Sequence, residues 1–163
     1  MKSLDTPTPE ARLPTAKSAR SADERPKIRA AIQRLGLAGL ANDTKWNRLI
    51  SEIRSWDGWR PSFRHCWLEN DYISGWDVEW FYHLPIPFIG VRWFEISCTQ
   101  ELPASGGRYS PDALRLPKIV SHLTTVVSLV SDIGFTFRVY DQTVRIFGYS
   151  PVDERFIAST QAQ

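Results

Sequence analysis

The residues best suited to acid–base or metal chemistry lie within seven positions of one another: Asp77, Glu79 and His83. If this segment is a β-strand, all three side chains project from the same face, because side chains alternate between the two faces of a strand. Two carboxylates beside a histidine could act as a general acid and base, or could hold a divalent metal ion. The alternative is a solvated polar face of a half-buried strand, which the same alternation produces.

The two cysteines of the chain, Cys66 and Cys98, are the candidate nucleophiles, with His65, His83 or His122 as a base. His65 and Cys66 are adjacent in a predicted strand and therefore point to opposite faces. A buried cysteine behaves as a small hydrophobic residue, so we predict that both cysteines pack in the core. Their spacing matches neither a metal site nor a disulfide scaffold, and we expect no metal and no cofactor.

Two arginines are predicted to face each other near the end of the chain. If Asp141-Gln142 is a two-residue hairpin loop, Arg138 lies directly opposite Arg145, with Tyr140 and Phe147 beside them. Like charges opposite each other destabilise a strand pair, so another group must compensate. A nucleic-acid phosphate could do so, with the aromatic rings as a stacking surface, and so could an acidic partner. The internal alternative is a carboxylate on a neighbouring strand: Asp77, Glu79 or Glu95.

Aromatic residues give the strongest indication of an interaction surface. All seven tryptophans lie between Trp46 and Trp93, and tryptophan and tyrosine are enriched at protein interfaces and their hot spots. Core packing is the alternative for most of them. Trp56, Trp59 and Tyr72 lie in polar loops, and we expect some of these three to be exposed. A protein-binding surface would combine these aromatics with nearby charged residues: Trp56, Asp57, Trp59, Asp71, Tyr72, Asp77, Glu79, Arg138, Tyr140 and Arg145.

The elements that would position these residues begin with two helices. Apolar residues at helical spacing predict a helix over Pro26–Leu35 and a second from the capping residues Asn42–Thr44 to Trp56. A third helix is predicted over Pro117–Ile133, with Gly134 as its C-terminal cap. We expect these helices to cover one face of a sheet.

Runs of aromatic and β-branched residues predict five strands. They are Ser62–Glu69, Trp76–Leu84, Val91–Cys98 and the hairpin Phe135–Tyr140 with Thr143–Tyr149. The order α-α-β-β-β-α-β-β indicates an α+β domain with an antiparallel sheet of about five strands and helices packed on one face.

Alternation within the two central strands predicts which side chains face the core. In the first of these strands the apolar set points inward: Trp76, Val78, Trp80, Tyr82 and Leu84. In the second, the inward set is Arg92, Phe94, Ile96 and Cys98. In the final hairpin, Phe135, Phe137 and Val139 are expected to face the core with Val144 and Ile146.

Length and charge place the functional part of the chain in one domain. A chain of 163 residues is most simply a single domain, which we assign to residues 26–150, with a flexible tail over 1–25 and a fraying C-terminal tail over 151–163. Residues 1–40 carry eight Lys/Arg and four Asp/Glu, whereas the remainder carries twelve and fourteen. The basic charge therefore lies at the N-terminal end, and the body is mildly acidic, unlike most nucleic-acid-binding domains.

Cellular location is inferred from what the sequence lacks. The chain contains no run of 18 apolar residues and no apolar signal-peptide stretch at its start, so we expect no membrane association and no secretion. With only two cysteines, a reduced, cytoplasmic protein is the expectation.

Three segments read NDTKWNRLISEI, WDVEWFYHLPIPFIGVRWFEI and VRIFGY. In these segments, which span about residues 42–149, the chain resembles a family of small bacterial proteins of unknown function. The resemblance supplies no catalytic residue and no cofactor. Small single-domain bacterial proteins of this style are often immunity proteins paired with secreted toxins, which is an analogy of class.

The leading hypothesis is a non-enzymatic, cytoplasmic protein-binding domain, of the immunity type that neutralises a toxin by direct binding. The first alternative is a nucleic-acid-binding protein that uses the basic tail with Arg138 and Arg145. The second is a metal-dependent hydrolase that uses Asp77, Glu79 and His83.

Overall fold

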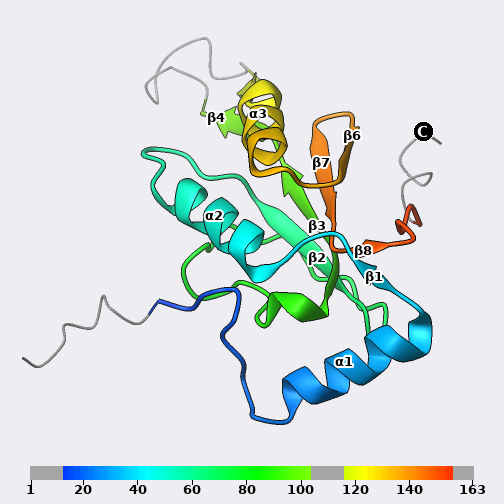
Figure 1. Ribbon diagram of the computed structural model, residues 1–163. Coiled ribbons are helices and arrows are strands. Elements are labelled where there is room, and N and C mark those ends of the chain that lie inside the picture. The colour runs from blue at the N-terminus through cyan, green and yellow to red at the C-terminus, as the bar shows by residue number, and fades with distance from the viewer. Residues whose placement is uncertain (1–12, 104–115, 156–163) are drawn as a thin grey trace, which may run out of the picture.

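The computed structural model describes residues 13–103 and 116–155. A four-stranded antiparallel sheet in the order β2-β3-β7-β6 forms its centre. Helices α2 and α3 cover one face of this sheet, and α1 lies at one end of it (Figure 1). The predicted class, an α+β domain with helices packed on an antiparallel sheet, is confirmed. The central elements are α1 (Glu24–Leu35), α2 (Asp43–Arg54), β2 (Phe63–Trp67), β3 (Val91–Ser97), α3 (Leu123–Ile133), β6 (Phe137–Tyr140) and β7 (Thr143–Phe147).

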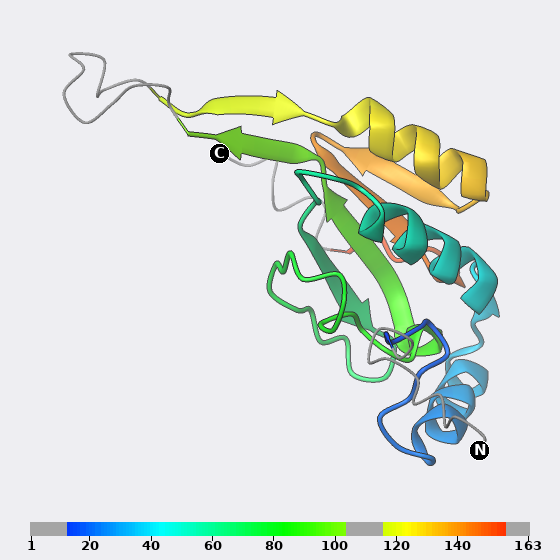
Figure 2. The same ribbon diagram turned by 90° about the vertical axis from the view of Figure 1, so that its left-hand side faces the viewer.

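Two small two-stranded sheets flank the central one. Strands β1 (Ala38–Gly39) and β8 (Tyr149–Ser150) pair beside α1, while β4 (Thr99–Leu102) and β5 (Lys118–Ser121) pair in an arm. Figure 2 shows this arm projecting away from the body, with α3 following directly from its second strand. The arm therefore brings the start of α3 next to the loop that follows α2.

Helix α2 forms where its capping residue and apolar stripe predict it. The side chain of Asn42 accepts a hydrogen bond from the backbone N–H of Lys45 at 2.9 Å, which satisfies a free donor of the first turn. The stripe of Trp46, Leu49, Ile50 and Ile53 is buried. Beneath it lie Phe94 and Ile96 of β3 and Val144 and Ile146 of β7, all fully buried in the same core.

Both faces of β3 are buried, which the sequence does not predict. Phe94, Ile96 and the following Cys98 face the helices as expected, but Arg92 is only half-buried. Trp93 and Glu95, which alternation places outward, are also enclosed. Trp93 packs with Leu40, Ile73 and Val152, and Glu95 pairs with Arg64 and Arg145. Residues 151–155 contribute to this cover, because they fold back over the face of the sheet opposite the helices, where Asp153 is buried.

The strand predicted over Trp76–Leu84 does not form. Asp77 makes one isolated bridge with Phe63, and a turn follows at Trp80–Tyr82. Trp80 and Leu84 are buried as predicted. The other three residues of the expected core face are exposed: Trp76 (45%), Val78 (65%) and Tyr82 (68%).

The helix predicted over Pro117–Ile133 is shorter. Lys118–Ser121 instead forms β5, paired with β4 in the register Gln100↔Val120, and the helix begins at Leu123. Two β-branched residues in this short run favour the strand. Its end at Gly134, which has a left-handed φ of 85°, is as predicted. In the following hairpin, Phe135, Val144 and Ile146 are buried as expected, Phe137 is partly buried, and Val139 is exposed.

Segments outside the central sheet also contact the body. Ala16 is fully buried; its N–H donates to the side chain of Asn47 at 2.7 Å, and its carbonyl accepts from Phe88. The remaining parts of the two expected tails, residues 1–12 and 156–163, lie outside the described residues. Within the described ranges, no helix has the length and apolar character needed to cross a bilayer.

Candidate functional site

Asp77, Glu79 and His83 come together in a turn instead of on a strand face. Asp77 accepts from the backbone N–H of Glu79 at 2.8 Å and lies 2.9 Å from the ring of His83. The Glu79 carboxylate accepts hydrogen bonds from the backbone N–H groups of Phe81, Tyr82 and His83. In a strand, these backbone N–H groups would be hydrogen-bonded to a partner strand; here the two carboxylates accept them instead. Their lone pairs are used to hold the turn, and this explains why the strand does not form.

The two cysteines are core residues, as predicted. Cys66 and Cys98 are both fully buried, and burial raises the pKa of each thiol to about 11. A thiol with so high a pKa remains protonated at neutral pH and is a poor nucleophile. His122, one of the candidate bases, is instead bonded to Gln100 at 2.8 Å.

His65 is a buried histidine whose two ring nitrogens have no hydrogen-bond partner among the described residues. Burial, with a smaller contribution from the positive charge of Arg20, lowers the pKa of His65 to about 4. In the unfolded chain the same group has a pKa near 6.5. Below pH 6.5, His65 binds a proton in the unfolded state but remains neutral in the folded state. The folded state therefore loses stability as the pH falls towards 4.

We therefore expect the free energy of unfolding to fall by up to about 3 kcal/mol between pH 6.5 and pH 4 because of His65. A His65→Phe variant should show a flatter profile over this window in urea titrations at a series of pH values. His83→Ala, which removes an exposed histidine, is the control and should keep the wild-type slope. An unchanged slope in His65→Phe would contradict this assignment.

Arg138 and Arg145 face each other across the last hairpin, in the register predicted. Their environments differ sharply. Arg145 is completely buried; it donates to Glu95 at 2.6 and 2.9 Å, and its guanidinium lies 3.9 Å from the ring centre of Trp93. Arg138 is exposed and pairs with Glu154. The internal alternative is thus confirmed for Arg145, with Glu95 as the carboxylate.

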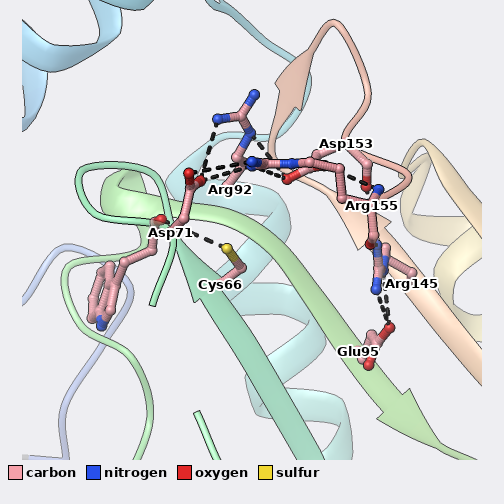
Figure 3. A network of polar contacts seen from close by, with 8 residues as sticks. Cys66, Asp71, Arg92, Glu95, Arg145, Asp153 and Arg155 are labelled. Carbon is pink, nitrogen blue, oxygen red and sulfur yellow. Dashed lines mark hydrogen bonds and ion pairs between the residues drawn. The ribbon is translucent and has the colours of Figure 1, made fainter. Parts of the chain in front are cut away.

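Residues 151–155 are held to the sheet by further arginine–carboxylate contacts (Figure 3). Arg145 donates to the backbone carbonyls of Asp153 and Arg155 at 3.0 and 2.9 Å. Arg155 in turn binds Asp153 and Asp71, and Arg92 lies 3.4 Å from Asp153. We call this set, Asp71, Arg92, Glu95, Arg145, Asp153 and Arg155, the arginine network.

Asp71 and Asp153 of this network, together with Cys66 beside it, form a group that could hold a metal ion. The ligand atoms of Cys66, Asp71 and Asp153 lie within 4.8 Å of one another. A hydrogen bond from Arg155 lowers the pKa of Asp71. Burial, the largest single influence on Asp153, acts to raise its pKa, but hydrogen bonds from Arg155 and the charges of Arg155 and Arg92 together lower it. With their charges already paired to arginine, and with the Cys66 thiol protonated, the two carboxylates serve to fix the chain and make a poor cation site.

A different group, at the end of α2, is open to solvent. The rings of Trp56 and Trp59 lie nearly parallel with their centres 6.1 Å apart, and the ring of His122 stacks on Trp59 at 4.0 Å. These three residues, with Asp57 and Thr125, line a depression of about 290 Å³. We call it the aromatic depression. Asp57 and Thr125 are exposed and the three rings are half-buried, so the lining is accessible to a partner.

The structure thus separates the ten residues predicted for partner binding. Trp56, Asp57 and Trp59 meet in the aromatic depression, and Tyr72 is exposed as predicted. Asp77 and Glu79 hold the turn. The remaining four residues lie in or beside the arginine network: Asp71, Arg138, Tyr140 and Arg145.

Sequence reasoning misses His122 and Thr125 as parts of the depression. They lie more than 60 positions after Trp59 and reach it only because the arm formed by β4 and β5 places the start of α3 there. No local pattern in the sequence indicates this contact.

A family of unknown function matches residues 28–153, which include the segments that carry the resemblance, so the resemblance to an uncharacterised family is confirmed. No curated protein and no solved structure matches the chain.

Proposed function

Because the chain belongs to DUF6678, a family of unknown function, we propose its role from its own surface: it is a non-enzymatic domain that binds another protein through the aromatic depression. One observation carries the proposal, the stack of Trp56, Trp59 and His122 at an accessible surface. Half-buried tryptophans with rigid ring positions are typical of interface hot spots, because they add contact area at little cost in conformational entropy.

The geometry around the stack supports a protein partner. Asp57 lies at the depression, and no hydrogen bond or ion pair reaches its carboxylate from the described ranges, so it is available to an incoming charge. An apolar centre with a charged residue at its edge is the usual anatomy of a protein–protein interface.

The two alternatives receive less support. For nucleic acid, Arg145 is enclosed and Arg138 is paired with Glu154, so neither offers an unpaired charge to a phosphate. For a hydrolase, the carboxylates of Asp77 and Glu79 accept hydrogen bonds from backbone N–H groups of their own turn, which leaves them less available for catalysis.

The finer proposal is that the partner is a secreted toxin and that the protein is a cytoplasmic immunity protein. The aromatic depression would cover part of the toxin surface, and the mildly acidic body, with Asp57 at the contact, would attract a cationic toxin such as a nuclease. The toxin and immunity roles are proposed by analogy with other small proteins of this kind.

Co-expression tests the proposal. Toxins encoded beside the gene are expressed in cells together with the protein. The toxin against which the protein protects the cells is then used in a direct binding measurement. Trp59→Ala should weaken binding by about 2 kcal/mol, roughly 30-fold, because it removes the centre of the stack. Leu35→Ala, which trims an exposed residue of α1 at the other end of the molecule, should bind as the wild type does. Failure to protect against, or to bind, any of these toxins would refute the immunity role.

Equal affinity of Trp59→Ala and wild type would instead place the interface elsewhere on the protein. The melting temperatures of both variants serve as the folding control. Trp59 is only half-buried, so we expect the Trp59→Ala chain to remain folded.

A further inference from the structure

The lining of the aromatic depression contains groups that attract a positive charge. It combines the indole rings of Trp56 and Trp59, one face of Trp59 being covered by His122, with the carboxylate of Asp57. No lysine or arginine of the described residues lines the depression. An aromatic face carries the negative part of the ring quadrupole, which attracts a cation placed over it. Ring faces and a carboxylate together therefore select a positively charged group.

Elsewhere on the protein, arginines already occupy aromatic faces. Arg64 lies 4.8 Å from the ring centre of Trp76, Arg145 lies 3.9 Å from that of Trp93, and Arg54 and Arg60 lie over Phe81. Trp56 and Trp59 have no such cation from the described part of the chain.

Arg60 is the arginine that follows Trp59 directly in sequence, and it is committed elsewhere. It donates to the backbone carbonyls of Ile53 and Arg54 at 3.2 and 2.8 Å while its guanidinium covers Phe81. Arg60 therefore does not supply the cation that the depression favours, and no other arginine or lysine of residues 13–103 and 116–155 lines it.

We propose that the aromatic depression binds an arginine side chain of the partner protein. This inference rests on the proposed function and names the chemical group that the site recognises. A guanidinium can stack flat on an indole ring and pair with Asp57 along its edge, whereas a lysine ammonium is a more strongly hydrated point charge without a planar face. A volume of about 290 Å³ lies at the lower end of the range for ligand pockets, which suits one side chain.

A titration with small probes tests this without an identified partner. N-acetyl-arginine methylamide is added to the full-length protein, and the indole N–H signals of Trp56 and Trp59 are followed by NMR. We expect saturable shifts at both positions. The matched probe, N-acetyl-citrulline methylamide, has the same shape without the charge and should give no saturable shift there.

Variants locate the binding. Asp57→Asn should lower the affinity for the arginine probe by about fivefold at low salt, as expected for loss of one exposed ion pair. Added salt should also lower the affinity of the wild-type protein for this probe. Trp76, whose ring already carries Arg64, is the internal reference and should not shift in a saturable way.

The inference is overturned if the arginine and citrulline probes shift Trp56 and Trp59 alike, or if neither does. Either result leaves the proposed function standing, because a protein partner could fill the depression with an apolar group. The Trp59→Ala binding experiment decides that separate question.

Discussion

Replacing Arg145 by methionine is expected to lower the free energy of unfolding by about 3–5 kcal/mol, the usual cost of removing one partner from a buried ion pair. Arg145 is fully buried, and Glu95 beneath it has a side chain that is 3% exposed. Without the guanidinium, Arg64 is the one charged partner that the described residues leave to the Glu95 carboxylate. The carbonyls of Asp153 and Arg155 also lose their donor.

Arg138→Met is the matched control for this experiment. It removes the arginine directly opposite on the same hairpin, but this side chain and its partner Glu154 are both about half exposed. Exposed ion pairs contribute about 0–1 kcal/mol, so urea denaturation should separate the two variants by several kcal/mol. Equal losses would show that the burial of Arg145 does not govern its contribution.

A double variant, Arg145→Met with Glu95→Leu, tests the cause. Removing both charges avoids an unpaired buried carboxylate, so the double variant should be at least as stable as Arg145→Met alone. If the double variant loses as much stability, relative to the wild type, as Arg145→Met and Glu95→Leu lose in sum, the unpaired buried carboxylate is not the reason for the effect.

The arginine pair illustrates how far the sequence alone reaches. Register is a local property of the hairpin loop and of strand periodicity, and the opposition of Arg138 and Arg145 was therefore predictable. The burial of Arg145 and the exposure of Arg138 were not predictable, because they arise from Asp153 and Arg155, which cover Arg145 and leave Arg138 open. Those residues follow Pro151, where the sequence loses its periodicity, so no pattern indicates that the chain folds back over the sheet.

The candidate site was predictable to a similar degree. Trp56, Asp57 and Trp59 lie together in a polar loop, and the exposure of Asp57 and the partial exposure of the two tryptophans follow from that position. His122 depends on the β4–β5 arm, a long-range arrangement that replaced the first turns of a predicted helix. Helix α2, by contrast, has its cap, stripe and end encoded within one segment, and it formed as predicted.

The segment around Trp76 and Trp80 shows why a period-two pattern can mislead. Alternation puts both tryptophans on one face, but alternation has this meaning only if the backbone is extended. Here Asp77 and Glu79 bind backbone N–H groups of their own segment, which turns the chain. Trp80 then points into the core and Trp76 remains at the surface.

Trp80→Ala should therefore cost about 3–5 kcal/mol, the range for truncating a large buried aromatic side chain. The Trp80 ring packs 4.9 Å from that of Phe63 and 5.8 Å from that of Phe94. Its indole N–H donates to the carbonyl of Pro61 at 2.7 Å. Alanine would leave a cavity beneath α2 and an unsatisfied carbonyl beside it.

Trp76→Ala is the control, since it removes the same side chain four positions earlier. Trp76 is 45% exposed and its ring lies beneath Arg64, so the loss should stay near 0.5–1 kcal/mol, the value of an exposed cation–π contact. Thermal and urea unfolding of the two variants measure the difference. A large loss in both would mean that the segment is an extended strand after all, with its tryptophans sharing one buried face, and the turn held by Asp77 and Glu79 would have to be rejected.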